Sequence, residues 1–314
     1  MALRTGHAIH ARHHHRGWSR DHAPVLTVAP GETVEVEVVD TSGGEITPQT
    51  TLADLPRLDH TRFTPLTGPI AIDGAEPGDT VSITFLDFVL SGWGWSVVSP
   101  RYGILADAFP ESFLKIWHYD PSGTRPAMFN ESARVPIKPF PGIVGLAPAE
   151  PGSHSALPPR RVGGNLDMRD LSVGAVLHLP VEVAGGLLSL GDTHAAQGHG
   201  ELAGTALESP MSVVIKVDLV KGWQLPGPWL TTTGPVARHL DGAGYHVTCG
   251  VDDDLLEASR IAARHMIGLL GRLHGCSPME AYLLCSVCGD LVISEMVNRP
   301  TSVVSLYFPQ AVFD

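Results

Sequence analysis

The stretch PGETVEVEV (residues 30–38) occurs a second time in altered form as PGDTVSITF (residues 77–85). In both copies a Pro-Gly turn precedes strict alternation of apolar and polar side chains. Alternation with a period of two places all apolar side chains on one face of an extended segment, as a half-buried β-strand requires. The repeated stretch therefore predicts two strands, and an aspartate closely follows each of them, Asp40 and Asp87.

Further apolar segments extend this pattern along the chain. Two sheets packed face to face would bury the alternating faces, so the sequence predicts a mainly β (α+β) protein resembling a β-sandwich. Between residues 91 and 160, tryptophan, proline and glycine recur without a clear period, and ordered loops over a core are expected there. The other predicted strands are 176–183, 187–190, 212–219, 291–296 and 303–308.

The chain changes character after residue 250. Asp254 begins a segment with apolar side chains at helical intervals, and Ser277-Pro278-Met279-Glu280 has the cap, proline and acidic residue of a helix start. These signals predict a C-terminal helical hairpin docked against strands. Because no segment reads as a flexible linker, residues 1–314 are expected to form one compact unit. Its sub-regions are a β-rich part (1–160), a central β part (161–250) and an α+β part (251–314).

Composition limits the classes of partner. Apolar residues make up 43% of the chain and charged residues 17%, so a sizeable core can form. The net charge of −12 disfavours nucleic acid and anionic membranes as partners. No apolar run reaches the roughly 18 residues of a membrane-spanning helix, and no signal peptide is visible. A cytoplasmic location and a homo-oligomer, with a dimer favoured, are expected.

The segment GDTHAAQGHGE (residues 191–201) carries the densest chemistry. Asp192 and His194 are two residues apart, so on an extended segment both point to the same side. Imidazole nitrogen and carboxylate oxygen together suit zinc and similar divalent ions, and His199 and Glu201 lie nearby. The same residue types also fit a polar, glycine-rich turn between two strands. Residue types alone leave both interpretations open.

Five blocks in order resemble the acetamidase/formamidase family of amide hydrolases. The segment 191–201 is similar to the family's central motif, and the resemblance covers nearly the whole chain. The other blocks are HRGW (15–18) with 24–34, then 68–80, then 139–142 with 163–167, and finally 281–291.

The resemblance implies hydrolysis of small linear amides, such as formamide or acetamide, to a carboxylate and ammonia. A divalent ion, zinc before calcium, would be held by Asp192, His194 and Asp167. Glu201 would take the proton of the attacking water, and Gln197 would donate to the developing oxyanion. Alternatively, Asp167 caps a turn, Glu201 is a metal ligand and Gln197 stabilises a turn. The additional candidates are His15, His199 and Glu208, and the small residues Ala195, Ala196, Gly198 and Gly200 would leave room only for a small acyl group.

Two departures from the family pattern motivate an alternative. His199 and Asn298 stand where the family carries carboxylates, which is also consistent with a catalytically altered or non-enzymatic metal-binding paralogue. A thiol-dependent amidase using Cys285 or Cys288 is a third hypothesis. These two residues form a lone Cys-x-x-Cys in a predicted helix, which is more typical of small buried side chains.

Overall fold

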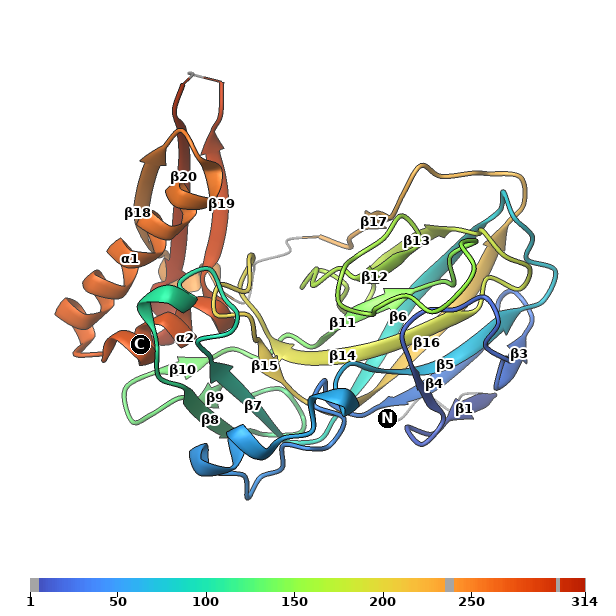
Figure 1. Ribbon diagram of the computed structural model, residues 1–314, viewed down its shortest axis with the longest axis horizontal. Helices are drawn as coiled ribbons and strands as arrows, with labels where there is room; N and C mark the ends of the chain where they lie inside the picture. Colours follow the sequence, from blue (N-terminus) through green and yellow to red (C-terminus); the bar gives the residue numbers. More distant parts are fainter. Residues whose placement is uncertain (1–5, 235–239, 298–299, 314) are drawn as a thin grey trace.

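The computed structural model describes residues 6–234, 240–297 and 300–313 (Figure 1). Strands dominate and form two large sheets, and a separate module of two helices and three strands follows them. Among the described residues, five short 3-10 helices lie in the connections between these elements: η1 (Leu52–Arg57), η2 (His60–Arg62), η3 (Ala106–Ala108), η4 (Asp241–Ala243) and η5 (Gln310–Val312). The mainly β class predicted from sequence is confirmed.

The repeated Pro-Gly stretches become neighbours of one strand in the six-stranded sheet. β4 (Thr33–Val38) and β6 (Thr80–Leu90) lie on either side of β16 (Met211–Val220), both antiparallel to it. The apolar side chains of β4 are buried while their neighbours are only half-buried, as the alternation predicts. The strand order is β1-β4-β16-β6-β13-β17, which adds β1 (His7–Ile9), β13 (Val176–Pro180) and β17 (Trp229–Thr231).

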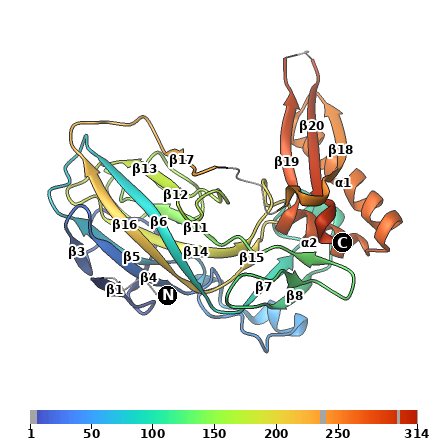
Figure 2. The same cartoon turned by 180° about the vertical axis from the view of Figure 1, so that it is seen from behind.

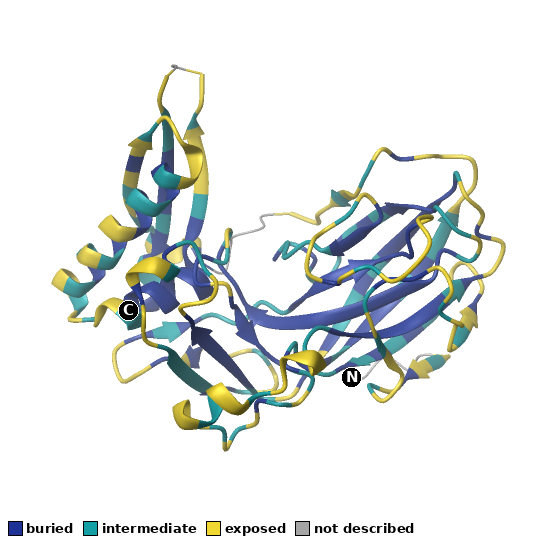
Figure 3. Ribbon diagram, viewed as in Figure 1, coloured by how far each residue is buried: buried dark blue, intermediate teal, exposed yellow. Residues whose placement is uncertain are grey.

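A nine-stranded sheet is built around β14 (Leu188–Ala196), every residue of which is buried (Figure 3). β14 pairs with β11 (Phe140–Gly145), β5 (Pro65–Ile72) and β15 (Leu207–Glu208). The other members are β2 (His14–Arg16), β3 (Leu26–Val28), β7 (Trp93–Val98), β8 (Phe113–His118) and β12 (Gly163–Asn165), while β9 (Ala127–Met128) pairs separately with β10 (Arg134–Val135).

The prediction of loops across residues 91–160 was wrong, since β7, β8 and β11 lie there. Trp95 and Trp117 are buried side chains of these strands. Gly94 interrupts the pattern for a packing reason, because a Cβ at this position would lie 2.3 Å from the carbonyl oxygen of Glu208. In the sequence, a glycine that allows two backbones to approach closely therefore resembled a glycine of a turn. Gly163, the first residue of the family-like block 163–167, likewise begins a short strand, β12.

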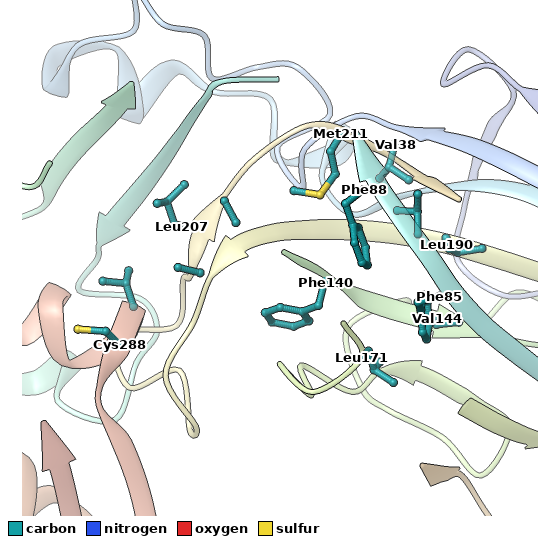
Figure 4. Close-up of a cluster of buried hydrophobic side chains, with 14 of the residues drawn as sticks. Val38, Phe85, Phe88, Phe140, Val144, Leu171, Leu190, Leu207, Met211 and Cys288 are labelled. Carbon is teal, nitrogen blue, oxygen red and sulfur yellow. The ribbon is translucent and has the colours of Figure 1, made fainter. Parts of the chain in front are cut away.

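The core fills the space between the two sheets (Figure 4). Val38, Phe85 and Met211 come from the six-stranded sheet and meet Leu190 and Phe140 of the nine-stranded sheet. The two alternating faces thus bury each other, as expected for sandwiched sheets.

The C-terminal module stands beside the far end of β14 and β15 (Figure 2). α1 (Leu255–His274) packs on β18 (Tyr245–Asp252) and β20 (Ser302–Pro309), and β19 (Asp290–Glu295) pairs with β20. α2 (Pro278–Cys288) contacts α1, so the predicted helical hairpin is confirmed, and Asp254 and Ser277 cap the two helices. Among the residues placed, no helix is long and apolar enough to cross a membrane.

Candidate functional site

A buried cluster of acids surrounds one histidine on β14. His194 Nε2 lies 3.2 Å from Asp192 Oδ1, so the two side chains share a face as their spacing predicted. Asp192 has a φ of 54°, a left-handed conformation that is uncommon for residues other than glycine and often found at functional sites. Glu208 lies opposite His194 on β15, with its Oε2 3.1 Å from His194 Nε2. Residues 191–196 of this segment lie within β14, whereas residues 197–206 form the connection to β15 with a turn at His199 and Gly200, so the turn interpretation holds only for the second half of the segment.

Two loop residues complete the cluster. Ligand atoms of Asp167, Asp192 and His194 all lie within 4.8 Å of one another, and so do those of His194, Glu201 and Glu208. Asp167 and Glu201 also have positive φ angles, 47° and 43°. Four carboxylates therefore converge on one imidazole.

A glycine on β11 makes room for the cluster. A Cβ on Gly142 would lie 2.6 Å from Asp167 Oδ1 and 2.8 Å from His194 Cε1. Phe140, two residues earlier, places its ring edge-on to the His194 ring with 5.0 Å between centroids. β11 thus provides space on one side of the carboxylates and an apolar wall against the imidazole.

The electrostatics of the cluster call for a positive charge. Burial, reinforced by the charge of Asp192, raises the pKa of Asp167 to about 7, and burial raises the pKa of Glu208 to about 8. Burial opposes the charged form of His194, yet the charges of Glu208 and Asp192 raise its pKa well above the ordinary value. Asp167 Oδ1 is buried without a hydrogen-bond partner, and Glu208 Oε2 is buried with the His194 nitrogen 3.1 Å away. Buried anionic oxygens of this kind are costly unless a cation or protons offset them.

Gln197 determines which nitrogen of His194 faces the acids. Its Nε2 donates to the carbonyl oxygen of Asp167 at 2.8 Å, so its Oε1, 2.8 Å from His194 Nδ1, accepts a hydrogen from that nitrogen. In the neutral imidazole the lone pair is then on Nε2, aimed at Asp192 and Glu208. Histidines that bind metals are commonly oriented in this way by a hydrogen bond from the other ring nitrogen. Gln197 thus holds His194 in this orientation, while its amide nitrogen has a second N–H besides the one donated to Asp167.

His15 and His199 are not brought into the cluster. His15 Nε2 lies 2.9 Å from Ser189 Oγ, and its ring packs against His22 with 4.4 Å between centroids. The side chain of His199 is 39% exposed, and its Nε2 lies 3.6 Å from Asp170 Oδ2. Asn298 lies outside the described residues.

The C-terminal module anchors the loop that carries Gln197 and Glu201, a role that sequence reasoning missed. The buried Arg169 guanidinium forms a two-point contact with Asp290, at 2.6 Å for Nη2 to Oδ2. Asp290 Oδ1 also accepts from the backbone N–H of His199 at 3.1 Å. A buried ion pair between distant segments leaves no pattern in one sequence.

Close packing also explains the glycine that was expected to accommodate the acyl group. A Cβ on Gly198 would lie 1.9 Å from the carbonyl oxygen of Gly289, so Gly198 is small because the module contacts it. Cys285 and Cys288 are buried in α2, and burial raises the pKa of both thiols. A buried, protonated thiol is a poor nucleophile, which counts against the thiol hypothesis.

The sequence profile of the Acetamidase/Formamidase family matches this chain over residues 4–155 and 152–314. The chain belongs to the acetamidase/formamidase family. A formamidase from Methylophilus methylotrophus is 30% identical over 266 residues, which cover 66% of this chain and 64% of that enzyme. The chain therefore matches just under two thirds of that relative's length. An acetamidase from Mycolicibacterium smegmatis is 28% identical over 86% of this chain and 84% of its own length.

Solved structures share the fold of this family member. The γ-lactamase from Delftia acidovorans superimposes with a TM-score of 0.89 over 98% of this chain and 94% of its own, at 24% identity. An acetamidase from Bacillus halodurans gives a TM-score of 0.67 at 29% identity, covering 98% of both chains. The cluster around His194 therefore lies within an established fold.

Proposed function

We propose that the chain hydrolyses small linear amides to a carboxylate and ammonia at the cluster around His194, with a divalent metal bound there. Family membership makes it an amidohydrolase that acts on carbon–nitrogen bonds other than peptide bonds. The substrate follows from its relatives, a formamidase and an acetamidase. The observation that supports the metal is the His194 Nε2 atom, which faces two buried carboxylates while its other nitrogen is held by Gln197.

The donor set fits a divalent ion. Asp167, Asp192 and His194 would hold it, and Glu208 offers a further buried oxygen beside His194, while Asp167 Oδ1 has no hydrogen-bond partner. One imidazole with carboxylate oxygens suits zinc better than calcium, which prefers oxygen ligands alone. When bound, such an ion supplies an acidified water and polarises the amide carbonyl.

Glu201 is positioned to move the proton. Burial and the charge of Asp167 raise its pKa well above the ordinary value, which makes it a stronger base than an exposed glutamate. Glu201 accepts the proton of the water whose oxygen forms the new bond to the carbonyl carbon. It then gives that proton to the amide nitrogen as the carbon–nitrogen bond breaks, so that nitrogen leaves as ammonia and the acyl group as a carboxylic acid, which loses its own proton to solvent and becomes the carboxylate.

One of the two sequence differences that motivated the paralogue alternative, His199, lies outside the cluster. His199 lies against Asp170 rather than among the carboxylates, so its difference from the family pattern removes no member of the cluster. The acids and the imidazole required for the proposed chemistry are present. A dimeric assembly stays a prediction.

Ammonia release from formamide and acetamide tests the proposal. Glu201→Gln should lower kcat by at least about 100-fold, the typical contribution of a general base, because the amide cannot accept the proton. Glu150→Gln, at a side chain 77% exposed, is the matched control and should behave as wild type. Equal turnover of Glu201→Gln and wild type would reject the assigned role, and no ammonia from either amide would reject the function.

A further inference from the structure

A cavity of about 450 Å³ opens between η1 and β7. It lies in the range of small-molecule sites, which are typically mostly apolar and hold a few polar groups. Its walls are largely apolar, with His60, Arg101 and Glu111 as exposed ionisable groups. The apolar walls come from Ile46, Leu52, Leu55, Leu58, Trp95 and Val97.

The register of the nine-stranded sheet places this cavity on the same face as the candidate site. His194 lies opposite Glu208, and Glu208 lies opposite Trp95. Directly opposed residues on neighbouring strands project from the same face, with Cβ atoms about 5 Å apart. Val97 follows Trp95 at the same-face spacing of two residues, roughly 7 Å farther along β7. The face that carries the imidazole and carboxylate therefore continues as the floor of the cavity.

Contacts between side chains join the two regions. The indole N–H of Trp95 donates to Asp40 Oδ1 at 3.0 Å, and the side chain of Thr41, the next residue, hydrogen-bonds to Asp192. Tyr102, another cavity residue, packs against the loop after Glu201, since a Cβ on Gly204 would lie 2.6 Å from Tyr102 Cδ2. The cavity wall is thus built on the elements that hold Glu201 and Glu208.

The size of the cavity does not match the smallest amides. Formamide and acetamide would leave almost all of it unfilled. Hydrolysis that releases ammonia fixes the nitrogen side of the substrate as NH₂, so only the acyl side can vary. An apolar acyl group would bury its surface against the cavity walls, at about 25 cal/mol for each Å² removed from water.

We propose that this cavity is the acyl-binding pocket and that the preferred substrates are primary amides with a bulky apolar acyl group, branched aliphatic or aromatic. The inference rests on the proposed function and extends it. The carboxamide reacts at the cluster around His194, and the acyl group extends past Trp95 toward Val97 and Leu55.

Comparing phenylacetamide with acetamide tests the pocket. In the wild type, kcat/KM for phenylacetamide should exceed that for acetamide by at least about tenfold, the lower end of what one apolar group contributes in a fitted pocket. Leu55→Trp fills the cavity from the short helix η1, where the side chain is only half-buried, and should lower this ratio by about tenfold or more. Leu273→Trp, at a side chain 50% exposed on α1, is the matched control and should keep the wild-type ratio.

The outcomes separate the two proposals. If acetamide is hydrolysed but the wild type shows no preference for phenylacetamide, or Leu55→Trp leaves the ratio unchanged, the pocket is wrong and the proposed function stands. If neither amide releases ammonia and formamide does not either, both proposals fail together.

Discussion

At the scale of single residues, the site depends on how His194 is oriented. Gln197 holds Nδ1, so Nε2 is directed at Asp192 and Glu208. Asp192 keeps its place in β14 at the expense of a left-handed backbone conformation. Four carboxylates face a single imidazole, and a bound cation would offset this excess of negative charge.

Replacing Gln197 tests this orientation. Gln197→Ala should weaken metal affinity by about 10- to 100-fold, because the imidazole loses the partner that fixes its tautomer. Competition with a chromophoric chelator measures the affinity directly, without reference to turnover. Gln49→Ala, at an exposed glutamine, should bind metal as wild type does. Equal affinities for Gln197→Ala and wild type would show that the hydrogen bond has no such role.

His15 gives a pH dependence of stability rather than of chemistry. Burial, with His22 nearby, lowers the pKa of His15 to about 4. The neutral form is favoured in the fold, so its stabilising effect is complete above the unfolded pKa of 6.5 and is lost as pH falls from there toward 4. The loss amounts to at most about 3 kcal/mol.

Urea unfolding of wild type and His15→Gln between pH 7.5 and 4 measures this difference. The free energy of unfolding should fall more steeply with acid in the wild type, since only that chain has a half-buried imidazole at residue 15 to protonate. Parallel curves would place the acid sensitivity elsewhere.

At the scale of elements, the sequence predicted what alternation could show. β4, β6 and β16 are half-buried, so their apolar residues recur with a period of two. β14 is buried on both faces, so it lacks that period, whereas β7 does alternate (Trp93, Trp95 and Val97) but carries a packing glycine, Gly94, that resembled a loop residue. Asp192 and His194 could be paired by spacing alone, whereas Asp167, Glu201 and Glu208 join them only through strand order and loop conformation.

The buried ion pair between Arg169 and Asp290 connects the C-terminal module to the rest of the site, and its loss should lower the free energy of unfolding. Arg169→Met removes the cation from the buried pair with Asp290 and should lower the free energy of unfolding by about 3–5 kcal/mol. The Arg169→Met/Asp290→Leu double variant should recover part of that loss, because no unpaired charge remains buried. Chemical denaturation of both variants checks the order. A single variant as stable as wild type would mean that the pair does not hold the module.

At the scale of the whole molecule, three parts meet at the cluster. The two sheets bury one core, β14 carries Asp192 and His194 to its far end, and the C-terminal module fixes the loop beyond (Figure 1). Three family-like blocks far apart in sequence, 139–142, 163–167 and 191–201, therefore converge at the cluster, which is why no single motif could define the site. His199 is the exception, since its place in the motif predicted a role that its position does not support.

Elemental analysis of the purified protein and of its His194→Ala variant tests the central claim most directly. The account predicts about one divalent ion per chain in the wild type, zinc before calcium, and little in His194→Ala, because the variant lacks the only nitrogen ligand of the cluster. Removal of the ion by chelation should abolish ammonia release from formamide and acetamide, and restoring the ion should recover it. Metal-free protein that hydrolyses these amides at the full rate would contradict the account.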